Sequence, residues 1–333
     1  MTTATTQPTQ MIYVDGLENS IYDRQVFQEL RAGRITCAVV TMAFWEDTLE
    51  TMDRIGQWHD FAEQNADLIL LARTTRDIEH AAATGRTAIM LGTQNSSPIA
   101  DRVRFVELFH DMGLRVMQLT YNNQNALGGS CYEPRDSGLT RFGEQVIREM
   151  NRVGMLIDIS HVGERTGLEA AERSERPIAI THANASSLVP HKRNKGDDLI
   201  TAVAERGGII GIPTYPKICG DYYAASLERW CELILRTVEI AGIDHVGIGT
   251  DIGRNEDQAY LDWMRVGRWT KGEFYGAGSA ASPGVTPPPD WMKTTEGFPA
   301  VELELRRHLP EADVAKVMGG NWMRVYRDVI DPT

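Results

Sequence analysis

The chain is poor in cysteine and has no long apolar run. Its four cysteines, Cys37, Cys131, Cys219 and Cys231, lie far apart and form no C-x-x-C pair. This spacing excludes a zinc knuckle and a disulfide framework, and it favours free thiols in a reducing compartment. No stretch approaches the roughly 18 consecutive apolar residues that a membrane span requires. We therefore expect a cytoplasmic protein without membrane association.

Basic residues are also scarce. Lys and Arg number 34 against 46 Asp and Glu, so the formal net charge is -12. Nucleic acids and anionic membranes need clustered positive charge, so both are excluded as partners. Hydrophobic residues at 42% and charged residues at 24% are ordinary for a globular protein. A small molecule or a peptide is the partner that this composition favours.

Short apolar runs recur along the chain and alternate with amphipathic segments. The runs cover residues 11–15, 35–42, 87–92, 115–121, 155–161, 177–182, 207–213 and 245–251, with an accessory run at 68–72. Helical spacing, with apolar residues at i, i+3 and i+4, marks residues 48–65, 101–112, 140–153 and 226–241. Apolar strands that alternate with helices indicate a parallel sheet covered by helices.

The number of strands decides between two architectures. Eight strand runs favour a closed (β/α)8 TIM-type barrel. An open dinucleotide-binding sheet is not expected, because no G-x-G-x-x-G follows the first run. We predict a flexible tail at residues 1–10 and one barrel domain at 11–333. Gly, Pro and Ser are enriched at 267–289, which predicts a long late loop around 254–295.

Polar residues gather where the apolar runs end. In a barrel these ends face one shared mouth, where catalytic side chains from several strands meet. The residues are Asp15 with Asn19, Gln94 with Asn95, Tyr121 with Asn122, His161, His182 and Asp251. Any one of them could simply cap a strand, but six strand ends in register indicate a pocket.

Two histidines and one aspartate are the main candidates for chemistry. His161 and His182 end successive runs, so neighbouring strands would present two imidazoles side by side. Such a pair can bind a zinc-like ion or act as an acid/base pair without metal. Asp251 can exchange a proton with water.

These residues lie in segments that resemble the membrane dipeptidase (renal dipeptidase) family of zinc peptidases, in the amidohydrolase superfamily. The resemblance extends over nearly the whole chain. The similar segments, in family order, are MNRVGMLIDISHVG, PIAITHANASSL, HKRNKGDDLI, GIDHVGIGTD and GGNWMRV. The resemblance implies a metallo-dependent hydrolase-like barrel.

The resemblance also implies roles for individual residues. His161 and His182 would hold one metal, and Asp251 would assist the attacking water. Arg193 would bind a substrate carboxylate through two parallel hydrogen bonds, although on its own it could equally form a surface ion pair. The predicted substrate-binding residues are Arg193, Asn194, Tyr121, Asn122 and Gln94, and the predicted catalytic residues are Asp251, Tyr121 and His182.

Four groups expected from the family are replaced. Leu17 and Asn19 stand where the family has a histidine and an aspartate in the H-x-D pattern. Gln94 replaces the bridging glutamate, and Tyr121 replaces a further active-site histidine. Glu18 does not compensate, because it would point away from the pocket unless the strand bulges, although Asp15 can reach it.

These replacements bear directly on metal binding. Two divalent ions bring about +4 into a pocket, which carboxylates and hydroxide normally offset. Neutral Gln94, Asn19 and Leu17 cannot do so, and a two-metal centre is not expected. The remaining options are one divalent metal, zinc being the best match, held by His161, His182 and Gln94, or no metal.

Three functions remain open. The first is a divergent dipeptidase-like hydrolase acting on a small amide, dipeptide-like or amino-acid-derived carboxylated substrate. The second is a non-hydrolytic enzyme of the lyase or isomerase type. The third is a barrel that only binds a small ligand, which the polar replacements make less favoured. Trp263, Trp269 and Trp291 would mark a lid or a subunit interface, and a homodimer is the expected assembly.

Overall fold

A parallel barrel of eight strands organises the computed structural model, which describes residues 11–266 and 286–331. The strands, each hydrogen-bonded to the next, are β1 (Val14–Glu18), β2 (Cys37–Thr41), β4 (Thr87–Thr93), β5 (Leu114–Gln118), β6 (Leu156–Asp158), β7 (Ala179–Ile180), β8 (Ile209–Ile212) and β9 (Val246–Ile248). The first and last strands close the circle just beyond β9. There, Asp251 N donates to Leu17 O at 3.0 Å and Asn19 N donates to Ile252 O at 3.0 Å.

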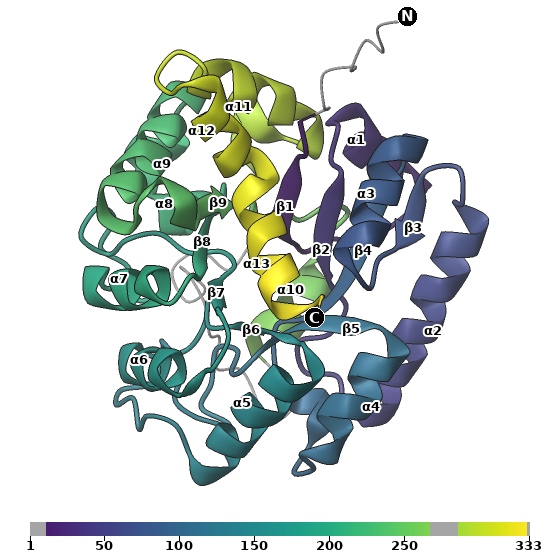
Figure 1. Cartoon of the computed structure of the whole chain (residues 1–333), viewed down its shortest axis with the longest axis vertical. Helices are drawn as coiled ribbons and strands as arrows, with labels where there is room; N and C mark the ends of the chain where they lie inside the picture. The colour runs from purple at the N-terminus through teal and green to yellow at the C-terminus, as the bar shows by residue number, and fades with distance from the viewer. Residues whose placement is uncertain (1–10, 267–285, 332–333) are drawn as a thin grey trace, which may run out of the picture.

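Helices surround this barrel (Figure 1). They are α1 (Arg24–Ala32), α2 (Thr48–Gln64), α3 (Thr75–Thr84), α4 (Arg104–Met112), α5 (Arg141–Val153), α6 (Glu164–Arg173), α7 (Asp197–Glu205), α8 (Pro216–Ala224), α9 (Leu227–Ala241), α10 (Gln258–Val266), α11 (Phe298–Leu305), α12 (Glu311–Ala315) and α13 (Asn321–Val329). Strand β3 (Ile69–Leu71) pairs only with β4, outside the barrel path. The barrel and its accessory strand are therefore confirmed.

Each of the eight expected runs overlaps a strand, and the four expected helices are present with ends that differ by a few residues. Two boundaries differ more. Strand β1 lies at Val14–Glu18 rather than 11–15, and its register with β2 shifts between Asp15 and Glu18. The loop expected around 254–295 contains helix α10, because Leu261 and Met264 pack against a buried aromatic cluster that includes Tyr121. Most of the predicted 267–289 loop lies outside the described residues.

The barrel interior forms its own hydrophobic cluster, separate from the layer between strands and helices. Alternate strand residues such as Val39, Met90 and Val116 fill it, whereas their neighbours face the helices. Helix α13 lies across one end of the barrel (Figure 1) and inserts Trp322 into this interior. A Cβ on Gly16 would lie 2.1 Å from the Trp322 ring, so only glycine permits this approach. The closed end leaves the opposite mouth for a functional site.

Two further expectations concern the cysteines and tryptophans. All four cysteines are free thiols, and three are buried. Trp291 packs against Trp230 and donates its indole hydrogen to Ala224 O at 2.9 Å, so it is part of the fold. Trp269 lies outside the described residues.

Among the helices of residues 11–266 and 286–331, none combines the length and apolar character needed to cross a membrane.

Candidate active site at the carboxyl ends of the strands

Two histidines meet at the open mouth of the barrel. His161 follows β6 and His182 follows β7, and their Nε2 atoms lie 3.0 Å apart. Both rings are buried, and His182 is completely so. Burial, and then the nearby Arg193 guanidinium, hold the pKa of each imidazole well below its usual value. The pair is therefore uncharged near neutral pH unless it binds a cation.

Oxygen atoms fix the second nitrogen of each ring. His182 Nδ1 lies 2.7 Å from Thr181 Oγ1, which donates to Asp158 Oδ2 at 2.7 Å. Since the Thr181 proton goes to the carboxylate, His182 Nδ1 must carry a hydrogen and donate it to Thr181. His161 Nδ1 lies 2.8 Å from Asn122 Oδ1 and, with this amide orientation, must also carry a hydrogen. Both Nε2 atoms then present lone pairs toward each other.

The two imidazoles are arranged in the way that ligands of a single metal ion are. Metal-binding histidines usually donate their other ring hydrogen to an oxygen, as His161 and His182 do here. Two nitrogen ligands of one tetrahedral zinc are about 3.3 Å apart, close to the distance between these Nε2 atoms. Gln94 lines the same cavity, and its Nε2 donates to Thr41 Oγ1 at 2.9 Å, which leaves Oε1 available. The residues fit a single ion.

Leu17 and Asn19, two of the residues considered for a second ion, offer it little. Leu17 has no donor atom, and Asn19 is a neutral amide whose oxygen accepts a hydrogen bond from Tyr260 Oη at 2.7 Å. Within residues 11–266 and 286–331, no group of three or more His, Cys, Asp or Glu residues could hold a metal. Asp15, the expected substitute carboxylate, instead accepts hydrogen bonds from both the backbone and the hydroxyl of Thr250. Glu18 is buried away from the cavity wall.

Aromatic and basic side chains complete the wall around His161. The Tyr121 ring stacks on His161 with ring centres 4.4 Å apart, and burial keeps the phenol protonated by raising its pKa. Arg193, 3% exposed, donates to Ser160 O and, at 2.8 Å, to His182 O. A guanidinium has five N–H donors, so Arg193 keeps others for a ligand.

Asn194 is placed differently from its sequence prediction. Its Nδ2 donates to Val189 O at 2.8 Å and Ile218 O at 2.9 Å, and its Oδ1 accepts from Asn184 N at 3.1 Å. These bonds hold the loop that carries Arg193, and Asn194 does not line the cavity. It is a scaffold residue of that loop.

Asp251 begins the loop after β9 in an unusual conformation. Its φ of 54° lies in the left-handed region, which non-glycine residues adopt mostly where surrounding structure enforces it. The hydrogen bond from Asp251 N to Leu17 O contributes to that restraint. Its carboxyl lines the cavity, and burial raises its pKa to about 7, an effect that Arg193 partly offsets. A carboxyl with this pKa can exchange a proton near neutrality.

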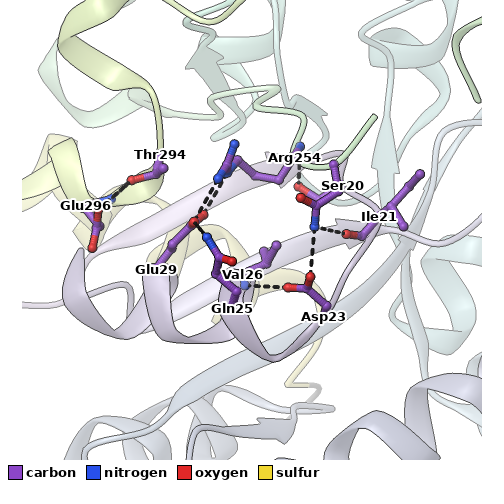
Figure 2. Close-up of polar contacts among 10 residues, drawn as sticks. Ser20, Ile21, Asp23, Gln25, Val26, Glu29, Arg254, Thr294 and Glu296 are labelled. Carbon is purple, nitrogen blue, oxygen red and sulfur yellow. Dashed lines mark hydrogen bonds and ion pairs between the residues drawn. The ribbon is translucent and has the colours of Figure 1, made fainter. Parts of the chain in front are cut away.

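Figure 2 shows how the loop after Asp251 is fastened to helix α1. The Arg254 guanidinium makes two hydrogen bonds of 2.8 Å to the Glu29 carboxylate. Asn255 Nδ2 donates to Ile21 O at 3.1 Å and to Asp23 Oδ2 at 3.2 Å. These contacts hold the loop between Asp251 and the start of α10.

The resulting cavity has a volume of about 390 Å³. It brings together the predicted residues Gln94, Tyr121, Asn122, His161, Arg193 and Asp251, with His182 directly behind His161. Sequence reasoning missed several lining residues, namely Tyr132, Tyr215, Arg254, Glu256 and Arg265. All lie in loops or on α10, where neither strand ends nor family segments indicated a role.

Comparison with known proteins agrees with this geometry. Residues 15–262 match the family described as membrane dipeptidase (peptidase family M19). Dipeptidase aclJ of Aspergillus oryzae is 29% identical over 86% of this chain, which spans 62% of that protein's length. The chain thus covers less than two thirds of the curated relatives that it matches.

Solved structures agree at the level of the fold. An amidohydrolase from Pseudomonas aeruginosa is 34% identical, with a TM-score of 0.88 and 97% of each chain covered. A Rhodobacter sphaeroides metallo peptidase, bound to a phosphinate mimic of the dipeptide L-Ala-D-Ala, has a TM-score of 0.77 at 16% identity and covers 96% of this chain and 99% of its own. Because the family model matches well over half of the chain, the chain belongs to the membrane dipeptidase family, peptidase family M19.

Proposed function

We propose that this protein is a divergent dipeptidase-like hydrolase that cleaves a small carboxylated amide and holds one divalent ion at most. The observation that carries the proposal is that Arg193 and Asp251 line one cavity around His161. In this proposal, Arg193 binds an anionic group and Asp251 exchanges a proton on the same bound molecule. Family membership and the dipeptidases among its relatives support the reaction class.

Each side chain has a role in this proposal. Arg193 binds the substrate carboxylate with the N–H groups that Ser160 and His182 leave free. Asp251, when ionised, accepts a proton from the attacking water as its oxygen bonds to the amide carbon, and it passes the proton to the leaving nitrogen as the C–N bond breaks. Tyr121, held protonated, donates to the carbonyl oxygen as negative charge develops there.

The ion would be held by His161, His182 and the Gln94 amide oxygen. When bound, a zinc-like ion supplies Lewis acidity at the carbonyl. The cytoplasmic location and the homodimer stay predictions.

The test is turnover of a dipeptide panel by the purified protein, before chelation, after chelation, and after adding back zinc, cobalt or manganese. Arg193→Lys should raise KM for dipeptides about tenfold or more and leave their C-terminal amides unaffected, because bidentate carboxylate binding is lost. Arg135→Lys, an exposed site outside the cavity, is the matched control. Absence of turnover in every metal condition would refute the hydrolase.

A further inference from the structure

A second cavity lies at the same end of the barrel as the catalytic cavity. Its wall is formed by Trp45, Ala100 and the segments 95–97 and 123–127, which follow β2, β4 and β5, and its volume is about 200 Å³. Among the described residues, no residue lines both cavities. Ala100 and Ala126 in this wall are exposed, so the cavity can be reached from solvent.

The Trp45 ring stands between the two cavities. It packs edge-on against Tyr121, a residue of the catalytic wall, with ring centres 5.3 Å apart. Two successive residues are divided in the same way. Asn122 lines the catalytic cavity, where its Oδ1 lies 2.8 Å from His161 Nδ1, whereas Asn123 lines the second cavity. The second cavity is therefore distinct from the catalytic one.

Asn123 carries a buried amide without a hydrogen-bond partner. The residue is 3% exposed, and neither Oδ1 nor Nδ2 has a partner among residues 11–266 and 286–331. Buried amides are nearly always paired, because an unmet donor or acceptor loses its hydrogen bonds to water. Both atoms are unpaired, so the observation holds whichever way the amide is turned. Asn123 therefore offers a donor and an acceptor side by side to a bound molecule.

Hydrogen bonds hold the wall around Asn123 in shape. Asn125 Nδ2 donates to Asn95 Oδ1 at 3.1 Å and to Ser96 Oγ at 3.0 Å, which ties the loop after β5 to the loop after β4. Asn125 Oδ1 accepts a hydrogen bond from Leu127 N at 2.8 Å. A wall that is already ordered lowers the entropy cost of binding a ligand.

The chemistry of this wall selects a neutral ligand. No charged side chain is among the described residues that line the cavity, so an ion would lose hydration without gaining a counter-charge. Trp45, Ala126 and Leu127 supply apolar surface. Since a cavity of about 150 Å³ holds benzene, one of about 200 Å³ has room for a ring with a small polar group.

We infer that this cavity is a second binding site, which takes a small primary carboxamide bearing an apolar group. The ligand N–H donates to Asn123 Oδ1, and the ligand carbonyl accepts from Asn123 Nδ2, so each unpaired atom gains a partner. The apolar group lies against Trp45 and Leu127. The inference goes beyond the proposed hydrolysis and does not depend on it, because the two cavities have separate walls.

The experiment uses benzamide as the probe and two ligands of similar shape as controls. Acetophenone keeps the carbonyl but has no N–H donor, and benzoate has no donor and carries a charge. Calorimetric titration of the full chain should give a Kd for benzamide about tenfold or more below the Kd of either control. A crystal structure of protein soaked with benzamide should place its carboxamide on Asn123. Equal affinities for the three compounds, water alone on Asn123, or benzamide only in the catalytic cavity would each overturn the inference.

Two variants test the site by different means. Asn123→Leu removes both polar atoms at similar volume and should weaken benzamide about tenfold or more. Ala126→Trp should obstruct the cavity and abolish binding while leaving Asn123 unchanged, so it decides the matter if Asn123→Leu does not fold. Gln64→Leu and Ala83→Trp, exposed on α2 and α3, are the matched controls and should bind benzamide as the wild type does. A benzamide affinity that neither cavity variant changes refutes the site.

Discussion

The Nε2 atoms of His161 and His182 face each other at 3.0 Å, and each ring's Nδ1 has an oxygen partner. We expect this relationship to limit the site to one shared ion, because both lone pairs point into the same small space. Leu17, Asn19 and Gln94 carry no charge, and we expect a second ion to need more negative charge than they supply.

Metal content should follow from this geometry. Purified protein titrated with zinc should bind no more than one equivalent per chain, and His161→Asn should abolish that binding because a single imidazole remains. His59→Asn, on the exposed face of α2, is the control. Elemental analysis after gel filtration measures the stoichiometry. Two tightly bound equivalents would contradict the single-ion site.

Asp251→Asn should reduce kcat by about 10²-fold to 10⁴-fold, the usual contribution of general acid–base catalysis. In the wild type, kcat/KM should rise with pH through a limb near 7, because the ionised carboxyl acts as the base and its pKa is about 7. Steady-state rates between pH 5 and 9 measure both effects. Asp60→Asn, exposed on α2, should change neither, and full activity of Asp251→Asn would exclude the proposed base.

The same carboxyl should affect stability in the opposite direction to activity. Its pKa is raised from 3.8 to about 7 in the folded protein, so its contribution to stability is present below pH 4 and is lost as pH rises through 7. Asp251→Asn should therefore raise the melting temperature more at pH 8 than at pH 4. Thermal unfolding at both pH values tests this, and an equal shift at both would refute the linkage.

Thr181 links Asp158 to His182 and should tune the histidine pair. Thr181→Val removes the hydroxyl that accepts from His182 Nδ1, and outer-shell changes of this kind typically cost 10-fold to 100-fold in metal affinity or activity. Thr181→Ser restores the hydroxyl and should recover most of the loss. Zinc affinity and kcat are the measurements. Equal behaviour of the two variants would show that the hydroxyl has no such role.

Trp322 should stabilise the fold without taking part in substrate binding or catalysis. Trp322→Ala removes a fully buried ring from the closed end of the barrel and should destabilise the protein by about 3–5 kcal/mol. The fraction that remains folded should keep its KM. Leu303→Ala, 66% exposed on α11, should change the free energy of unfolding by less than about 0.5 kcal/mol. Denaturant unfolding compares them.

The sequence by itself determined the barrel and the strand-end residues. Alternating apolar runs and helical spacing depend on local periodicity, so the eight strands could be predicted, and His161, His182 and Asp251 followed from their positions at strand ends. The family segments added Arg193. Helix α10 was missed because its packing against Tyr121 is a long-range contact.

The tertiary structure alone decided how the loops complete the cavity. Loop direction depends on contacts far apart in the chain, such as Arg254 with Glu29, which carry no local signal. For that reason the sequence did not indicate that Glu256 lines the cavity, or that Asn194 does not line it. Burial also sets the pKa of Asp251, and burial is a property of the whole fold rather than of neighbouring residues.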